Sequence, residues 1–447
     1  MSSRDLTRGP IPGHLLRLAG PMGFGIFAIM AFNLVDTWFV SKLGTQALAA
    51  MTLTFPVVML VGSVAMGLGV GVTSVLSRAI GNGRHEEVQR LTTHTLLLGV
   101  ALVVAISVVG LILAEPMLRG LGGEGEVLEL AASYLRIWFA GAGVVVVPML
   151  GMSAIRAAGD TRTPAVVMSA AGVANGVLDP LFIFGLGPIP AMGLEGAAIA
   201  TVASRAVTLV VALWVLHARE GLLRFSWDDL GLIPDSWGRV LLIGGPAAFT
   251  NLTQPLTIGF LTGLAAGFGE PAVAAFGAGG RVEMFALIPA MAMAMGLAPF
   301  VGQNHGAGDH PRVAEAVSLS LRVTIAMGVL SFGVLALFRD PLAAVFTDDP
   351  AVLPLLARYL WILPLSHVLV GAFFVATNTL NAVGRPLPAT VLTLLRTPIL
   401  LGGGAWLGAS VGGLTGFFWG SSVGLLASGA LGLLAMVVLG TAARSEA

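Results

Sequence analysis

Long apolar runs separated by short polar breaks make up most of this chain. A bilayer core about 30 Å thick needs roughly 20 apolar residues in a helix, and each run is at least that long. The pattern predicts an all-α, polytopic membrane protein. Its twelve expected transmembrane helices cover approximately residues 14–41, 47–79, 93–115, 129–155, 164–187, 193–217, 238–267, 272–303, 317–338, 354–379, 387–409 and 413–440.

The second half of the chain repeats the first at a constant offset of 225 residues. Gly20-Pro21 recurs as Gly245-Pro246, Glu115-Pro116 as Asp340-Pro341, and Tyr134-Leu135 as Tyr359-Leu360. Six spans return the chain to its starting side, so the pattern predicts two six-helix lobes related by a parallel pseudo-two-fold repeat. Such lobes enclose a cavity in one class of secondary transporter. We expect an N-terminal lobe over 1–217, a cytoplasmic linker over 218–237 and a C-terminal lobe over 238–447.

Composition narrows the class of function. Of 447 residues, 56% are hydrophobic and 10% are charged, the net charge is zero, and Cys is absent. Ordinary soluble domains carry about 25% charged residues, so a soluble enzyme or a nucleic-acid-binding protein is excluded. Without Cys there are no disulfides or thiolate metal sites. The sequence contains no P-loop motif, so we expect neither ATP as the energy source nor an organic cofactor.

The basic residues predict the orientation in the membrane. Fifteen of the 23 Lys and Arg residues fall at the termini and in the loops on the same side as the termini, five fall in the alternate loops, and three fall within spans. Because cytoplasmic loops carry the excess of basic residues, both termini are expected in the cytoplasm. The predicted location is the inner (plasma) membrane, which the chain crosses many times, as a monomer.

Ionisable residues within spans are costly and are functional candidates. Six were identified: Asp36, Asp179, Arg205, Arg281, Glu283 and Arg396. Helical spacing places Asn33, Asp36 and Thr37 on one face of the first span. Asn175 lies one turn before Asp179 in the fifth span.

A rise of about 1.5 Å per residue puts Asp36 about 9 Å and Asp179 about 12 Å from the external ends of their spans. Tyr134 in the fourth span and Thr201 in the sixth are expected at the same level. Two close carboxylates in a low dielectric disfavour double ionisation, so this site would hold a proton or a small cation. If the cation is Na⁺, its ligands would include Asp36, Asn175 and Asp179, since oxygen ligands suit a hard ion. The alternative is that both acids are structural caps or hydrogen-bond anchors.

The repeat places this chemistry in the first lobe alone, because Asp36 maps onto Leu261 and Asp179 onto Gly404. The other polar candidates are less specific. Arg281 and Glu283 could bind substrate or pair structurally with other groups. Arg205 could screen Asp179 or tie helices together, and Arg396 is expected to pack or snorkel.

Two further features concern the cavity and the first span. Met291 and Met295 could supply an adaptable apolar surface for substrate, or simply contact lipid or core. Pro21 lies a few residues into the first span, where it removes a backbone hydrogen bond and permits a bend.

Four motifs together resemble the multidrug and toxic compound extrusion (MATE) family over the full length. They begin at Asn33 (NLVDTWFV), Arg156 (RAAGDTRTP), Asn175 (NGVLDPLFIF) and Gly193 (GLEGAAIAT). The resemblance implies two six-helix lobes, alternating access, and export of amphipathic, often cationic compounds in exchange for H⁺ or Na⁺.

The chain is most similar to the DinF-like branch, which has its ion site in the first lobe. By motif match, Asp36, Asn175 and Asp179 fall on that branch's ion-site positions, with Tyr134 beside them and Thr201 as a further match. Pro21 falls on the proline at which span one of that branch is thought to bend. Another branch carries an essential acid in span seven, where this chain has Gln254.

The favoured function is a secondary active antiporter that exports drugs or metabolites, with a small-molecule substrate and the lipid bilayer as its partners. A flippase for lipid-linked saccharides shares the repeat architecture. An intramembrane enzyme would need a nucleophile–base pair or a metal cluster within the spans, and neither His nor Cys was expected there.

Overall fold

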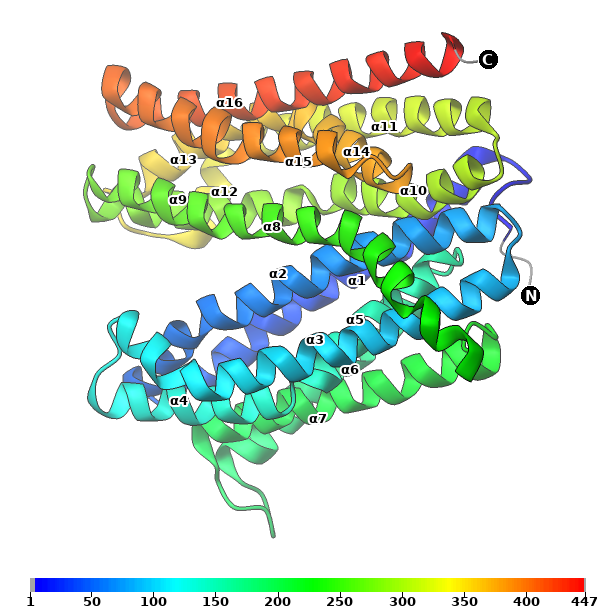
Figure 1. The fold of residues 1–447 in the computed structure, drawn as a ribbon. Coiled ribbons are helices and arrows are strands. Elements are labelled where there is room, and N and C mark those ends of the chain that lie inside the picture. The colour runs from blue at the N-terminus through cyan, green and yellow to red at the C-terminus, as the bar shows by residue number, and fades with distance from the viewer. Residues whose placement is uncertain (1–4, 446–447) are drawn as a thin grey trace. The chain divides into compact units, whose positions relative to one another are not determined.

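The computed structural model describes residues 5–445, and side chains as far as Val438. It is almost entirely helical (Figure 1), and the only β-pairing among the described residues is an isolated bridge between Leu186 and Ile189. The prediction of an all-α membrane protein is confirmed.

The helices of the first half are α1 (Ile11–Ser41), α2 (Thr45–Gly81), α3 (His85–Gly120), α4 (Gly125–Ala140), α5 (Ala142–Ala157), α6 (Arg162–Phe184), α7 (Gly193–Trp214), η1 (Val215–Arg219) and η2 (Trp227–Leu232). Those of the second half are α8 (Ile233–Ala266), α9 (Glu270–Ala286), α10 (Ile288–Gly306), α11 (His310–Leu337), α12 (Arg339–Phe346), α13 (Leu353–Ile362), η3 (Leu363–Ser366), α14 (His367–Ala382), α15 (Pro386–Leu394), η4 (Leu395–Gly403) and α16 (Gly404–Ser445).

These helices account for all twelve predicted spans. Eight helical stretches of the described chain are long and apolar enough to cross a membrane. Two bent pairs supply two more, with α4 and α5 meeting at 50° and α9 and α10 at 45°. One of the eight stretches, 386–438, is interrupted by the non-helical residues Gly412 and Gly413, and it therefore comprises two spans. α8, with 34 residues, covers the remaining predicted span, 238–267.

Glycines allow the two spans within 386–438 to pack closely as an antiparallel pair. A Cβ atom added at Gly408 would collide with the carbonyl oxygen of Gly416, and one added at Gly404 would lie 2.6 Å from the carbonyl oxygen of Gly420. Small residues at such an interface let two helix backbones approach each other within a membrane.

Gly408→Ala should therefore destabilise the folded transporter, by about 1–3 kcal/mol, because the added methyl group overpacks this contact. Gly263→Ala in α8 is the matched control, since a Cβ atom there has nothing within 4 Å. The measurement is the temperature at which each purified variant loses its monodisperse form. Equal temperatures for the two variants would contradict the close packing.

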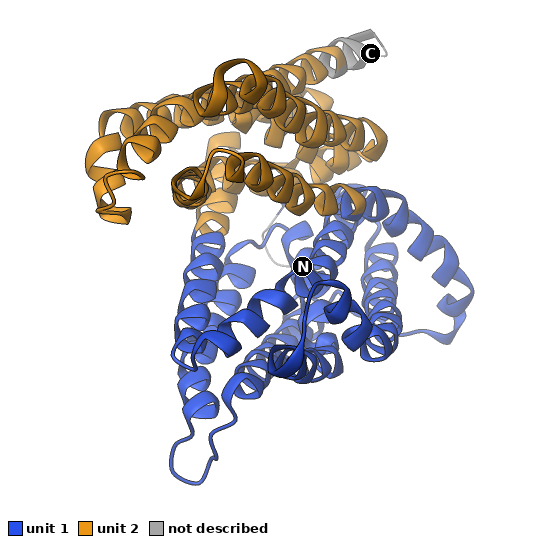
Figure 2. Ribbon diagram, turned by 90° about the vertical axis from the view of Figure 1, so that its left-hand side faces the viewer, with its two compact units in different colours: residues 1–5, 24–248 blue, residues 6–23, 249–447 orange. Residues whose placement is uncertain are grey.

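The chain forms two compact units whose boundaries follow the repeat (Figure 2). The first unit holds residues 1–5 and 24–248, and the second holds 6–23 and 249–447. The two boundaries after Gly23 and Ala248 are 225 residues apart, which equals the repeat offset. These units differ from the predicted lobes, since 6–23 belongs to the second unit and the expected linker 218–237 lies inside the first.

The beginnings of α1 and α8 pack in equivalent ways. In the first unit, Gly67 of α2 lies against Ala248 of α8. In the second unit, Ala292 of α10 lies 3.4 Å from the Cβ position of Gly23 in α1. Both pairs map onto each other at the offset of 225, with glycine and alanine exchanged. Pro21 and Pro246 each precede the unit boundary by two residues, so each helix lacks one backbone hydrogen bond near the point where it leaves one unit for the other.

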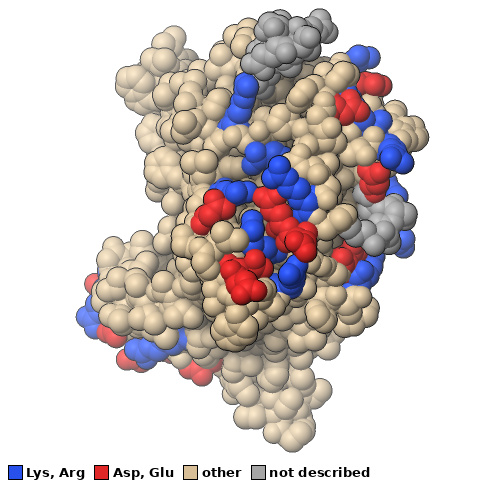
Figure 3. Space-filling model, turned by 45° about the vertical axis from the view of Figure 1, so that its right-hand side comes forward, with Lys and Arg blue, Asp and Glu red and all other residues tan. Residues whose placement is uncertain are grey.

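The expected linker is bound to the start of α3. Arg224 pairs with Glu86 at 3.1 Å, and Arg239, two residues beyond the linker, pairs with Glu87 at 2.7 Å. The indole nitrogen Nε1 of Trp237 donates a hydrogen bond to the carbonyl oxygen of His94 (2.9 Å). Basic and acidic side chains are interleaved in groups on the face seen in Figure 3, with uncharged surface between the groups. These contacts explain why 218–237 belongs to the first unit rather than separating two lobes.

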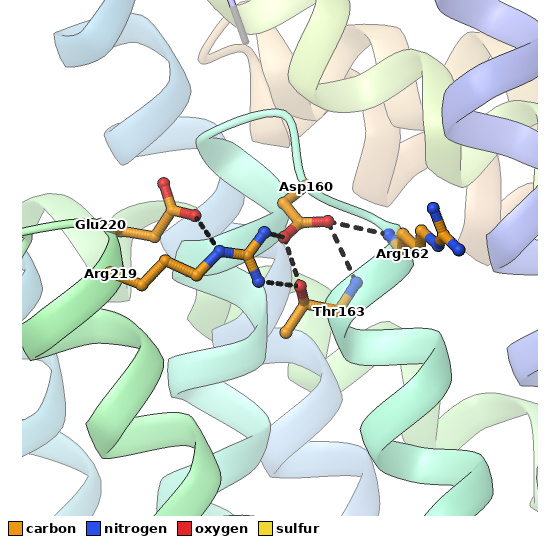
Figure 4. A network of polar contacts seen from close by, with 5 residues as sticks. All are labelled: Asp160, Arg162, Thr163, Arg219 and Glu220. Carbon is orange, nitrogen blue, oxygen red and sulfur yellow. Dashed lines mark hydrogen bonds and ion pairs between the residues drawn. The ribbon is translucent and has the colours of Figure 1, made fainter. Parts of the chain in front are cut away.

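The loop between α5 and α6 is held by Asp160 (Figure 4). Its Oδ1 accepts hydrogen bonds from the backbone N–H groups of Arg162 and Thr163, both at 3.0 Å, and so caps the first turn of α6. Its Oδ2 lies 3.3 Å from Nη2 of Arg219 at the end of η1. Asp160 of the RAAGDTRTP motif therefore has a structural role, because it ties the start of α6 to the end of the sixth span.

Candidate functional site

The second half of α1 packs along α6 through glycines of α6. A Cβ atom at Gly172 would lie 3.4 Å from Cβ of Phe32, and one at Gly176 would lie 3.8 Å from a methyl group of Val35. One turn further along, Asp36 and Asp179 face each other closely enough to interact electrostatically. Asp36 is 8% exposed and Asp179 is fully buried.

Three further side chains surround this carboxylate pair. The amide nitrogen Nδ2 of Asn175 donates a hydrogen bond to Oδ1 of Asp179 (2.5 Å). The hydroxyl group of Thr201 in α7 donates to Oδ1 of Asn175 at 3.5 Å. Tyr134 of α4 is buried within electrostatic range of both carboxylates. The five residues that the sequence placed at one level therefore lie together, and they come from four helices.

Two oxygen atoms at this site lack donors. Oδ1 of Asp36 and Oδ2 of Asp179 are buried, and neither accepts a hydrogen bond from an N–H or alcohol group of the described residues, although the two carboxyl groups are close enough to share a proton. A buried polar atom without a partner costs free energy, and a buried charge costs more. A proton on one carboxyl group or a cation between the two would remove that cost. Carboxylate, amide and hydroxyl oxygens suit H⁺ or a hard cation such as Na⁺.

Asn33 and Thr37 do not join the carboxylate pair. Both are exposed, whereas Asp36 is buried. The hydroxyl group of Thr37 donates to the backbone carbonyl of Asn33 (2.8 Å), a bond within one turn of α1. The helical spacing of the three residues is retained, since α1 is continuous through them, and the exposed Asn33 and Thr37 stay predicted cavity or substrate residues.

The remaining candidates separate into structural contacts and exposed positions. Arg205 lies with Nη1 3.4 Å from the sulfur atom of Met168, so it ties α7 to α6. Arg281 is exposed on α9. Met291 and Met295 are half-buried, whereas Met293 between them belongs to the core of the second unit.

Arg396 was expected to pack or snorkel, and its guanidinium group packs on two aromatic rings. Its guanidinium carbon lies 4.5 Å from the ring centre of Phe373 and 5.2 Å from that of Phe374. Such cation–π contacts stabilise a cation in apolar surroundings.

Sequence reasoning missed a polar cluster in the second unit. Tyr359 donates a hydrogen bond to Glu283 (2.7 Å), and Nε2 of His367 lies 3.3 Å from the same carboxylate. The expectation that the spans contain no His was wrong, because His94 lies within the predicted span 93–115 and His367 within 354–379. The position of His367 there was a signal that the search for carboxylates overlooked.

Comparison with known proteins identifies the family. A model of the MatE family matches residues 21–181 and again 246–405. The two matches begin 225 residues apart, which agrees with the repeat.

Similar proteins cover almost the whole chain. The FAD transporter of Shewanella oneidensis is 38% identical over 411 residues, which are 92% of this chain and 91% of that protein. The probable multidrug resistance protein NorM of Thermotoga maritima is 28% identical over 400 residues, with 86% and 82% covered. The Vibrio cholerae MATE transporter VcmN in its bent form superimposes with a TM-score of 0.92 at 32% identity, and 97% of each chain is covered. With its repeated family match and its helical membrane fold, this chain belongs to the MatE family of multidrug and toxic compound extrusion transporters.

Proposed function

We propose that this transporter is a secondary active antiporter that exports amphipathic compounds, often cationic drugs or metabolites, in exchange for H⁺ or Na⁺. The observation that carries the proposal is the carboxylate pair Asp36 and Asp179, which has buried oxygen atoms without hydrogen-bond donors. These two acids would bind the coupling ion, assisted by Asn175, Thr201 and Tyr134.

Coupling requires that the ion and the substrate favour different states of the protein. A ligand shifts a conformational equilibrium only by its different affinity for the two states. Loading the pair with a proton or a cation changes the net charge between α1 and α6, and hence how strongly these helices attract each other. In the proposed cycle, ion loading favours one shape of α1 and substrate favours the other, which produces alternating access.

The names of the relatives point to two classes of cargo. Several are multidrug resistance or export proteins, and the 38% identical relative is a FAD transporter. We propose amphipathic drugs or metabolites as cargo, with a flavin nucleotide as a specific candidate metabolite. The protein would reside in the inner (plasma) membrane as a monomer with both termini in the cytoplasm.

Vesicles containing the purified transporter test this function. Efflux of a cationic dye and of FAD is followed under an imposed pH gradient and, separately, an imposed Na⁺ gradient. The proposal expects one of the two gradients to accelerate efflux of at least one cargo above the rate in protein-free vesicles. Efflux of both cargoes that is indifferent to both gradients would contradict antiport.

Gln254 in α8 provides a test of where coupling occurs. It is exposed in the described structure and stands where another branch of the family carries an acid. Gln254→Ala should lower the transport rate at most modestly, by less than about threefold, within the context-dependent range for removing one polar contact. Loss of the gradient dependence in this variant would place an ion site in the second half.

A further inference from the structure

Four polar side chains from four helices of the second unit form a chain of hydrogen bonds that is centred on one carboxylate. They are Glu283 of α9, Tyr359 of α13, His367 of α14 and Ser331 of α11, and we call them the Glu283 cluster. The Tyr359 hydroxyl donates to Oε2 of Glu283 (2.7 Å), Nε2 of His367 lies 3.3 Å from Oε1, and Oγ of Ser331 lies 2.9 Å from Nδ1 of His367. Tyr359 is 1% exposed and His367 is 2% exposed.

The cluster lies deep along its span and beside two helix breaks. Glu283 is 13 residues after Glu270, the first residue of α9, and therefore about 20 Å along the helix. The 45° bend between α9 and α10 follows one turn later, at Leu287. His367 begins α14 directly after the break η3. A change in the bond between Glu283 and His367 would thus act where two spans already depart from straight helices.

The hydrogen bonds of the cluster accommodate two protonation states. With one ring proton, His367 donates from Nε2 to Glu283 and accepts at Nδ1 from Ser331. A second proton on Nδ1 would be donated to Oγ of Ser331, because a hydroxyl group both donates and accepts. Glu283 accepts hydrogen bonds in either state. The cluster can therefore take up one proton and leave each of these bonds formed.

The charged surroundings also permit this uptake. The titratable groups that face His367 from the packed helices are Glu283, Tyr359 and, from η4, Arg396, which interacts electrostatically with Glu283. The guanidinium group of Arg396 is stabilised separately by the rings of Phe373 and Phe374. The carboxylate of Glu283 thus remains available as the direct partner of a protonated imidazole.

The first unit has no equivalent of this arrangement. At the offset of 225, Glu283 corresponds to Val58, His367 to Ala142 and Ser331 to Ile106, while Tyr359 alone has a counterpart, in Tyr134. The two units therefore carry different polar clusters, each built around a tyrosine at the same place in the repeat.

We propose that the Glu283 cluster is a second proton-binding site, separate from Asp36 and Asp179, whose protonation changes the bend between α9 and α10. The proton converts the hydrogen bond between a neutral His367 ring and the Glu283 carboxylate into an ion pair, which holds the end of α9 more strongly against α14. Release of the proton weakens that contact and frees the bend.

The test uses the full-length transporter with the first site neutralised, as Asp36→Asn/Asp179→Asn, in lipid nanodiscs. Because the chain has no Cys, spin labels can be attached at the exposed positions Ala274 in α9 and Ala307 after α10, each changed to Cys. The distance between the labels should differ between samples held at about pH 8 and at about pH 5. Adding His367→Gln or Glu283→Gln should abolish that change.

His94→Gln is the matched control, since His94 is also buried and bonded to a serine, with Nδ1 2.9 Å from Oγ of Ser236, but lies in the first unit. It should leave the distance change intact. A distance that ignores pH, or a response that survives His367→Gln, would overturn the proposal. If either variant of the cluster fails to fold, ¹⁵N NMR spectra of the histidines in the parent protein report directly whether the His367 ring carries one proton or two. A His367 ring that gains a second proton as the pH falls supports the proposal, and one that keeps a single proton overturns it.

Discussion

Asp36→Asn should reduce gradient-driven efflux to the level of protein-free vesicles. The substitution keeps the size of the side chain but removes its negative charge. The side chain can then neither take up a proton nor neutralise a bound cation. The variant should still fold, because Oδ1 of Asp36 is buried and accepts no hydrogen bond from an N–H or alcohol group in the described structure, and an amide can donate to the neighbouring Asp179 carboxylate. Replacing an unsatisfied buried carboxylate by a neutral amide costs little or stabilises the protein. We therefore expect an unchanged or higher melting temperature alongside the loss of transport.

Asp348→Asn is the control for this experiment. It makes the same chemical change at an exposed residue in the turn between α12 and α13, and it should leave efflux at the parental rate. Normal gradient-driven efflux by well-expressed Asp36→Asn protein would refute the role given to the carboxylate pair.

Pro21→Ala should slow turnover several-fold while changing equilibrium binding of substrate much less. Alanine restores the backbone hydrogen bond that proline removes and adds no bulk, so it favours the straight form of α1. Asp36 lies on the same helix about four turns further along, and Gly23, the last residue before the unit boundary, lies between them. The measurement compares the efflux rate at saturating substrate with the dissociation constant of the substrate.

Pro246→Ala gives a matched comparison. It restores the equivalent hydrogen bond in α8, a helix with no acid at the position of Asp36. Both variants should be slower, but only Pro21→Ala should alter how transport depends on pH or Na⁺. An unaltered ion dependence in Pro21→Ala would separate the proline from the ion site.

Much of the fold followed from the sequence because membranes simplify the problem. Every backbone group in a bilayer must be bonded within the protein, so long apolar runs form helices, and the twelve predicted spans correspond to helical segments. The offset of the sequence repeat also recurs in features other than the repeated motifs. Its offset of 225 reappears in the two family matches and in the boundaries after Gly23 and Ala248.

The positions of the transmembrane spans in the sequence did not predict which residues belong to each of the two units. Which side of a helix packs on which neighbour depends on the shapes of both surfaces. Gly67 against Ala248, and Gly23 against Ala292, assign the starts of α8 and α1 to their units. The sequence prediction instead divided the chain into two lobes at the polar segment 218–237. In the structure this segment is attached to α3, through the ion pair of Arg224 with Glu86 and the hydrogen bond of Trp237 to His94.

The candidate site was predicted in part, for a similar reason. Depth along a span depends only on residue number, and it correctly grouped Asp36 with Asp179, Asn175, Tyr134 and Thr201. The direction of a side chain depends on packing, so the sequence alone did not show that Asp36 is buried while Asn33 and Thr37 are exposed. The Glu283 cluster was missed because its members are far apart in sequence and only Glu283 had been considered.

The distance between α1 and α6 tests the central claim most directly. Spin labels at Ser41, the last residue of α1, and at Leu186, two residues after the end of α6, each changed to Cys, report on the C-terminal ends of these two helices, and both positions are exposed. If ion binding at Asp36 and Asp179 drives the change in α1, the distance in the parent protein will respond to pH or to Na⁺, and Asp36→Asn will abolish that response. A distance that is indifferent to both ions in the parent, or that responds equally in Asp36→Asn, would contradict the mechanism.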